Sequence, residues 1–337
     1  MRKWMDKYGL FAAVIIGAVG FPFFRHLAPA LPPLIFLMLF FTFCKVNPLD
    51  LRWHKWHTFA LIVQLCLAMT SYLLVRAIGQ VWPVFQDPSV AQSWMLCFLM
   101  PSATAAPIIA GKLGGSIQNL TTYTLITNLS TAILVPLLFP WINPALDMPF
   151  WLSVWAILRR VGIVLLGPFV TAWLLRLIYD AIQRHKGSNK TFQLSRSWAQ
   201  VPFYAWVCTI LILMGNITNT LIYDTYSPLS AVLICIGALI SCFIQFTVGK
   251  WLGYRFPATS HGKDYKDVVI NPATAPTTPA GISRVTAGQA LGQKNTTLAI
   301  WLAQAYLNPL TALGPAAYMI IQNLFNAAQL TKAAKKT

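Results

Sequence analysis

Apolar blocks of about 20 residues dominate the sequence and show no amphipathic period. The hydrocarbon core of a bilayer is about 30 Å thick, so a helix needs about 20 apolar residues to cross it. Only 10% of the residues are charged and 57% are hydrophobic, which excludes an ordinary soluble domain. The sequence therefore predicts an all-α polytopic membrane protein with ten transmembrane helices. They are expected near residues 8–25, 30–46, 57–78, 90–113, 118–142, 150–178, 199–222, 229–253, 280–306 and 309–330.

The net charge of +17 is distributed unevenly over the connecting segments. With the N-terminus in the cytoplasm, only Arg25 and Arg76 fall in outside loops. This asymmetry predicts an even number of helices, two cytoplasmic termini and a place in the inner membrane. It also explains the charge without a nucleic-acid partner. Arg159 and Arg160, inside the sixth block, are expected to snorkel to the outer interface or to contact an anionic solute. The cations expected inside are Arg2, Lys3, Lys7, Lys45, Arg52, Lys55, Lys112, Arg176, Arg184, Lys186, Lys190, Arg196, Lys250, Arg255, Lys263, Lys266, Lys332, Lys335 and Lys336.

One full charge, Lys294, lies in the middle of the predicted ninth helix. The helix from Ala280, where the apolar stretch begins, to Lys294 has a length of about 21 Å, which places the amine deep in the bilayer. All eight acidic residues are Asp, and each falls at or beyond the end of a predicted helix. The amine therefore has no carboxylate partner in the membrane. Ionisable groups at such depth are costly and tend to mark a substrate or ion pathway.

The fourth and ninth predicted helices carry interruptions at corresponding places. Pro101 and Pro107 interrupt the fourth, and Gly288 and Gly292 flank the centre of the ninth. Paired interruptions of this kind point to the binding site of a transporter built from two inverted halves. We therefore expect one transport unit over residues 1–337, made of an inverted repeat of five plus five helices. The first repeat covers about 1–145 and the second about 146–337. Two ordinary kinked helices packed by small residues are the alternative.

Polar side chains gather around the same interruptions. A helix broken inside the membrane frees backbone groups that need polar partners or a bound solute. The candidates for binding a solute are Ser102, Thr104, Thr124, Asn128, Gln293, Asn295 and Thr296. Part of this set is equally suited to bonding the backbone one helical turn earlier.

Four segments together resemble the bile acid:sodium symporter family. They are PSATAAPIIAGKLGGSIQN and LSTAILVPLLFP in the fourth and fifth helices, and ALGQKNTTLAIWLA and GPAAYMIIQN in the ninth and tenth. The resemblance implies a panel of helices 1, 2, 6 and 7 that moves against a core of helices 3, 4, 5, 8, 9 and 10, in which the broken helices cross. It also implies secondary transport of a small or amphipathic organic anion by alternating access.

The chain departs from the family at the positions that bind sodium. The resemblance places the family's Ser-Asn pair on Ala106 and Pro107, its Glu on Ala290, its Gln on Lys294 and a fifth-helix Ser on Leu120, whereas Asn295, Thr124 and Gln64 persist. An ammonium in the same pocket would repel sodium. We therefore expect sodium-independent transport. A sodium-coupled symporter with a reduced site and a solute sensor derived from a carrier are the alternatives.

Three roles are open for Lys294. It is a fixed internal cation that replaces the sodium ion and bonds carbonyls of the crossed helices, a group that binds and releases a coupling proton, or a direct ligand of an anionic solute. Only the second role requires its protonation to change between the outward and inward states.

Other classes of site find little support. An intramembrane enzyme needs an Asp pair, a Ser with a Lys or His, or a His-rich metal site, and no such pattern is visible in the spans. We expect no catalytic residue, metal or cofactor, and no obligate protein partner. The expected partners are the lipid bilayer, a small organic anion and, for the coupling role, protons. His54 and His57, one turn apart near Trp53 and Trp56, suit an interfacial belt better than a metal pair.

Overall fold

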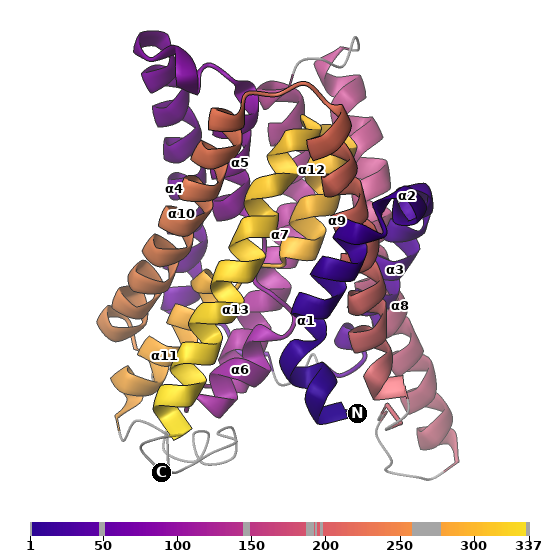
Figure 1. Ribbon diagram of the computed structural model, residues 1–337. Helices are drawn as coiled ribbons and strands as arrows, with labels where there is room; N and C mark the ends of the chain where they lie inside the picture. Colours follow the sequence, from indigo (N-terminus) through magenta and orange to yellow (C-terminus); the bar gives the residue numbers. More distant parts are fainter. Residues whose placement is uncertain are drawn as a thin grey trace. The chain divides into compact units, whose positions relative to one another are not determined.

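The computed structural model describes residues 2–46, 51–143, 149–186, 192, 194–195, 198–257 and 278–334 (Figure 1). These residues are almost entirely helical, and six of their helical segments are long and apolar enough to cross a membrane. The coarse prediction of an all-α membrane protein is therefore confirmed. The chain divides into two compact units, which we call unit 1 (Met1–Pro48 and Ala132–Thr225) and unit 2 (Leu49–Thr131 and Tyr226–Thr337).

Unit 1 holds the first, second, sixth and seventh of the predicted helices and the end of the fifth. Its elements are α1 (Arg2–Val19), α2 (Phe21–Phe24), the 3-10 segment η1 (Arg25–Ala30), α3 (Leu31–Phe43), the second half of α7 (Ile117–Ile142), α8 (Phe150–His185), η4 (Trp198–Gln200) and α9 (Val201–Tyr223).

Unit 2 holds the remaining predicted helices. Its elements are α4 (Lys55–Val81), η3 (Pro83–Phe85), α5 (Pro88–Leu99), α6 (Ala106–Lys112), the first half of α7, α10 (Pro228–Arg255), α11 (Pro279–Gly292), α12 (Thr296–Tyr306), η6 (Pro309–Ala312) and α13 (Leu313–Ala334).

The ten apolar blocks all fall on helical segments, although their boundaries shift. The boundary predicted at residue 25 is wrong: α1 ends at Val19, and an apolar helical segment then runs over Phe21–Phe43. Gly20 separates the two, and Pro22 lies at the first turn of α2, where a proline costs no hydrogen bond. The sixth block continues to His185 instead of residue 178.

Small residues allow close helix packing in unit 1. A Cβ atom at Gly17 of α1 would lie 2.6 Å from the carbonyl oxygen of Leu211 in α9. Gly215, also in α9, is equally close to Phe24. Backbones that approach this closely gain van der Waals contact, which is a main source of helix association in a membrane.

In unit 2, close packing at glycines also joins α10 and α11, and each of these helices contains a Gly-x-x-x-Gly sequence. A Cβ atom at Gly249 would lie 2.4 Å from the Ala287 carbonyl oxygen, and one at Gly253 would lie 2.1 Å from that of Ser283. On α11, Gly288 and Gly292 face α10 in turn. The two helices are therefore in backbone contact, and α10 forms a rigid support for the interrupted segment that follows α11.

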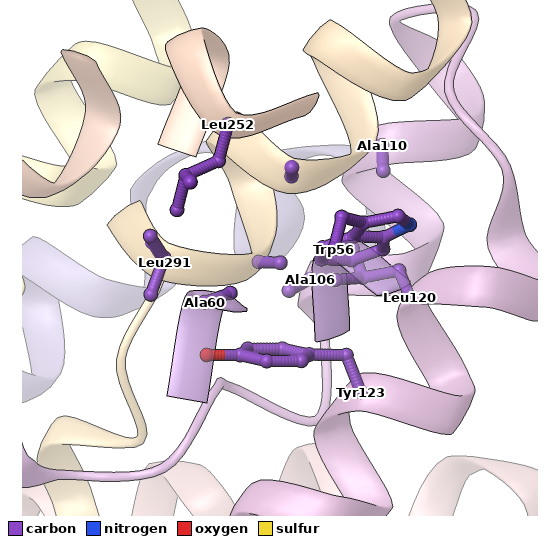
Figure 2. Packing of buried hydrophobic residues seen from close by; sticks show 10 residues of the cluster. Trp56, Ala60, Ala106, Ala110, Leu120, Tyr123, Leu252 and Leu291 are labelled. Atoms are coloured by element: carbon purple, nitrogen blue, oxygen red, sulfur yellow. The ribbon is translucent and has the colours of Figure 1, made fainter. Parts of the chain in front are cut away.

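A buried apolar cluster fills the space where α4, α6, α7, α10 and α11 meet (Figure 2). Trp56 and Tyr123 pack against each other as tilted rings with their centroids 5.4 Å apart. Leu252 and Leu291 bring α10 and α11 into the same cluster. Small residues, Ala60 among them, let these helices approach the aromatic pair.

Candidate functional site

Two interrupted helices meet inside unit 2, and we call the place where they meet the crossing. The first interruption separates α5 from α6 and the second separates α11 from α12. The Ala103 N–H donates to the Gln293 carbonyl oxygen and the Asn295 N–H donates to that of Pro101, both at 2.9 Å. Ser102 and Lys294 consequently face each other as an antiparallel pair. The sequence placed the interruptions in the correct segments.

The four residues expected to break the helices have different positions. Pro101 lies inside the first interruption, and Gly292 is the last residue of α11. Pro107 lies in the first turn of α6, which it helps to start. Gly288 lies within α11 and does not interrupt it, so its predicted helix-breaking role is wrong. A Cβ atom there would lie 2.7 Å from Cγ of Lys250, so this glycine makes room for a side chain.

Side chains from α7 and α13 fix the backbone of the facing pair. The Ser102 N–H donates to Oγ1 of Thr127 at 3.1 Å. The Lys294 N–H donates to Oε1 of Gln322 at 2.8 Å, and Nε2 of Gln322 donates to the Lys294 carbonyl oxygen at 3.2 Å. Backbone groups left free by an interrupted helix must be paired inside a membrane, and these side chains supply the pairing.

A glutamine and a tyrosine hold the end of α5. Nε2 of Gln64, in α4, donates to the carbonyl oxygens of Leu99 and Met100 at 2.8 and 3.0 Å. The Tyr123 hydroxyl donates to Oε1 of the same glutamine at 3.1 Å. The resemblance assigns Gln64 to a residual sodium site. In the structure, both the nitrogen and the oxygen of its side-chain amide form hydrogen bonds at the interruption.

A second glutamine and tyrosine link α5 to the end of α11. Nε2 of Gln245, in α10, donates to the Cys97 carbonyl oxygen and to the Tyr318 hydroxyl, both at 3.0 Å. The Tyr318 hydroxyl donates to the Gly292 carbonyl oxygen at 2.8 Å. Sequence reasoning missed Gln245, Tyr318 and Gln322. A glutamine inside an apolar helix and polar groups four residues apart on the last helix were the available signals.

The Lys294 amine is the most unusual group at the crossing. The residue is 2% exposed, and Nζ has no hydrogen-bond partner in the described part of the chain. Cys97 lies close enough to interact with it electrostatically. The amine bonds none of the described carbonyls, so the caps on the broken helices come from other side chains. Burying an amine without a hydrogen-bond partner costs free energy unless the amine interacts with another group.

Several other buried polar atoms also lack a hydrogen-bond partner in the described residues. Among the residues described, Oγ of Ser102, Oγ1 of Thr124, Oδ1 of Asn128 and Nδ2 of Asn295 have no hydrogen-bond partner, and each residue is at most 5% exposed. The crossing therefore offers both donors and acceptors to a polar solute. All four residues belong to the set that the sequence predicted.

The other predicted solute ligands differ from these four in their hydrogen bonds or in their burial. Gln293 is buried, and its Nε2 donates to Oε1 of Gln289 and to Oδ1 of Asn326. Thr296 is buried at the start of α12, where its N–H donates to the Lys294 carbonyl oxygen. Thr104 is half-buried in the first interruption.

Two of the predicted ligands also bond their own helices. Nδ2 of Asn128 donates to the Thr124 carbonyl oxygen one turn earlier, at 2.7 Å, and Oδ1 of Asn295 caps α12 by accepting from Leu298 N–H. Each therefore uses one end of its amide locally, as the backbone-bonding alternative proposed, and the other end has no hydrogen-bond partner in the described residues.

Three positions that the resemblance gives to sodium ligands lie together in apolar surroundings. Ala106, Leu120 and Ala290 are fully buried members of the cluster around Trp56 and Tyr123 (Figure 2). None of their side chains carries an oxygen atom. Sodium needs hard oxygen ligands, so this cluster does not supply the donor set that the family pattern implies.

The histidines at the start of α4 have structural contacts. Nε2 of His54 lies 3.1 Å from Oδ1 of Asn119, and Nε2 of His57 lies 3.0 Å from the carbonyl oxygen of the same residue. The His54 N–H donates to Nδ1 of His57, which closes the first turn of the helix. Burial lowers the pKa of His54. No group of three metal-ligating side chains occurs in the described ranges.

Comparison with known proteins gives no relative: no protein-family model matches the chain, and no curated protein matches it.

Proposed function

We propose that this protein is a secondary transporter that moves a small or amphipathic organic anion by alternating access, with the crossing of α5–α6 and α11–α12 as its solute site. The observation that carries the proposal is the buried Lys294 amine, which faces Ser102 in the crossing and has no hydrogen-bond partner in the described residues. Intramembrane charges at paired helix interruptions are typical of transporter sites. A cation with no described carboxylate beside it favours an anionic solute.

The contacts at the two interruptions support an inverted repeat. In the first half Gln64 bonds the end of α5 and accepts from Tyr123. In the second half Tyr318 bonds the end of α11 and accepts from Gln245. Thr127 follows Tyr123 by four residues and bonds the backbone of Ser102. Gln322 follows Tyr318 by four residues and bonds the backbone of Lys294. A glutamine, a tyrosine and a polar side chain four residues after the tyrosine thus recur in the same order in both halves of the chain, with the glutamine on the helix end in the first half and the tyrosine on it in the second.

The division into two units supports a moving panel and core. Unit 1 contains the helices that the bile acid:sodium symporter family would use as its panel, and unit 2 contains the interruptions and the site. In this proposal the chain is a member of that family in which Lys294 takes the place of the sodium ion. The amine then either remains a fixed cation, carries a coupling proton, or binds the solute directly.

Purified protein in liposomes tests the function. Uptake of labelled taurocholate and of short mono- and dicarboxylates is measured with sodium, with potassium in its place, and with an imposed pH gradient. We expect accumulation of at least one probe that is unchanged by the sodium replacement. A several-fold loss on that replacement would refute sodium independence, and binding without flux for every probe would favour the sensor. A response to the pH gradient would identify the proton as the coupling ion.

The proposed orientation has its own test. Both termini are placed in the cytoplasm of a cell with an inner membrane, because the loop cations are concentrated on that side. A C-terminal green fluorescent protein should be fluorescent and a C-terminal alkaline phosphatase inactive. The reverse pattern would contradict a cytoplasmic C-terminus.

A further inference from the structure

Three cations gather in unit 2 away from the crossing. Lys250 lies near the end of α10, Arg284 near the start of α11 and Lys332 in the last turn of α13. Lys250 is half-buried and close enough to both other cations to interact with them electrostatically. In the described part of unit 2 the one carboxylate is Asp87, which caps the start of α5. The three like charges are thus gathered with no described anion to offset their repulsion.

Lys250 is held in a defined position. Its aliphatic stem lies across α11 at Gly288, where a Cβ atom would lie 2.7 Å from Cγ of the lysine. Its ammonium lies 5.3 Å from the centroid of the Phe325 ring, which in turn packs on Phe246 at 4.4 Å. A cation that is fixed by packing and by an aromatic face binds an anion with little further ordering.

A buried amide donor lies on the same stretch of α13. Oε1 of Gln329 accepts from Nε2 of Gln289 at 2.9 Å, whereas its own Nε2 is buried without a partner in the described residues. Gln329 lies one turn after Phe325 and one turn before Lys332, so the three share a face of α13. The cluster therefore combines three cations with an unused N–H donor.

We propose that Lys250, Arg284, Lys332 and Gln329 form a binding site for a phosphate group. Several donors from three helices suit an anion with several acceptor oxygens, and Arg and Lys are the residues that bind such groups. Bound phosphate removes the repulsion among the three cations. The phosphate belongs either to a free anion or to a phospholipid headgroup. Gln289 links Gln329 of this site to Gln293 of the crossing, but the proposal does not depend on the proposed transport function.

Thermal unfolding of the full-length protein tests the site. The protein is placed in nanodiscs of phosphatidylcholine, and its Tm is followed with inorganic phosphate at constant ionic strength. A second series replaces part of the lipid with phosphatidylglycerol. At about ten times the dissociation constant, we expect a Tm rise of about 3 °C. A rise with free phosphate identifies a soluble anion, and a rise with phosphatidylglycerol alone identifies a headgroup.

Variants of the cluster test whether these residues cause the Tm rise. Arg284→Gln with Lys332→Gln removes two exposed charges and should abolish most of the Tm rise. Lys55→Gln removes an exposed charge at the start of α4 and should leave the rise intact. Lys250→Met keeps the aliphatic stem over Gly288 and should also abolish the rise. If that variant does not fold, the exposed double variant decides. No rise with either probe, or an equal rise in the double variant and in Lys55→Gln, overturns the proposal.

Discussion

Replacing Lys294 by methionine should stabilise the fold while abolishing transport. Methionine fills a similar volume and carries no charge. Because Nζ has no hydrogen-bond partner in the described residues, the change removes the cost of a buried amine and breaks no described contact of that atom. Charged residues at the centre of a membrane helix cost about 2.5 to 3.5 kcal/mol, so we expect a gain of about 1 to 3 kcal/mol in the free energy of unfolding. The crossing would at the same time lose the group proposed to act on the solute.

The matched control is Gln322→Met in the neighbouring helix. It leaves the N–H and the carbonyl oxygen of Lys294 without the two bonds that Gln322 makes, and it should lower the free energy of unfolding by about 2 kcal/mol. Thermal unfolding in detergent, followed by a thiol-reactive dye, measures both variants, and uptake into liposomes measures transport. If Lys294→Met lowers the Tm as much as Gln322→Met does, the amine is a structural element and the argument from its missing partners fails. Full transport by Lys294→Met would show that Lys294 is not required for transport.

Two further predictions concern packing and pH. Gly253→Ala should lower the free energy of unfolding by about 1 to 3 kcal/mol, because its Cβ would lie 2.1 Å from a carbonyl oxygen of α11; Gly162→Ala in α8 has nothing within 4 Å and should be neutral or slightly stabilising in the same unfolding assay. Because burial lowers the pKa of His54 from its usual 6.5, protonation favours the unfolded state, so Tm should fall as the pH drops below about 6.5. His54→Gln should weaken that fall, and an unchanged Tm profile would contradict the assignment.

The sequence predicts the helices and the location of the site because both depend on local signals. Apolar length identifies the spans, and Pro101 with Gly292 identifies the interrupted segments. The details of the interruptions were not predictable in this way. Gly288 reads as a break in the sequence, yet its role depends on Lys250, which comes from another helix. A glycine that makes room for a neighbour and a glycine that ends a helix have the same local pattern.

The caps at the crossing were missed for a related reason. Gln245 and Tyr318 lie in apolar helices far apart in the sequence, and only the fold brings them together, with Tyr318 at the end of α11. One of the three roles left open for Lys294 was an amine that bonds the free carbonyls. In the structure the amine lies at a crossing whose backbone is already bonded by Gln322. Hydrogen bonds between residues far apart in the sequence depend on tertiary packing, so they produce no periodic pattern in the sequence.

The difference between the two facing residues indicates where function resides in the proposed repeat. Ser102 and Lys294 occupy corresponding positions, and a side chain of α7 or α13 bonds the backbone of each. A side chain therefore pairs the backbone N–H on both sides, and the two facing side chains differ in kind, one being a hydroxyl and the other an amine. A change of charge on the amine acts directly on whatever lies at the crossing, because no described hydrogen bond depends on Nζ. Lys294→Arg separates the remaining roles: arginine stays charged at every accessible pH, so a fixed cation should retain transport in this variant and a titrating one should lose it.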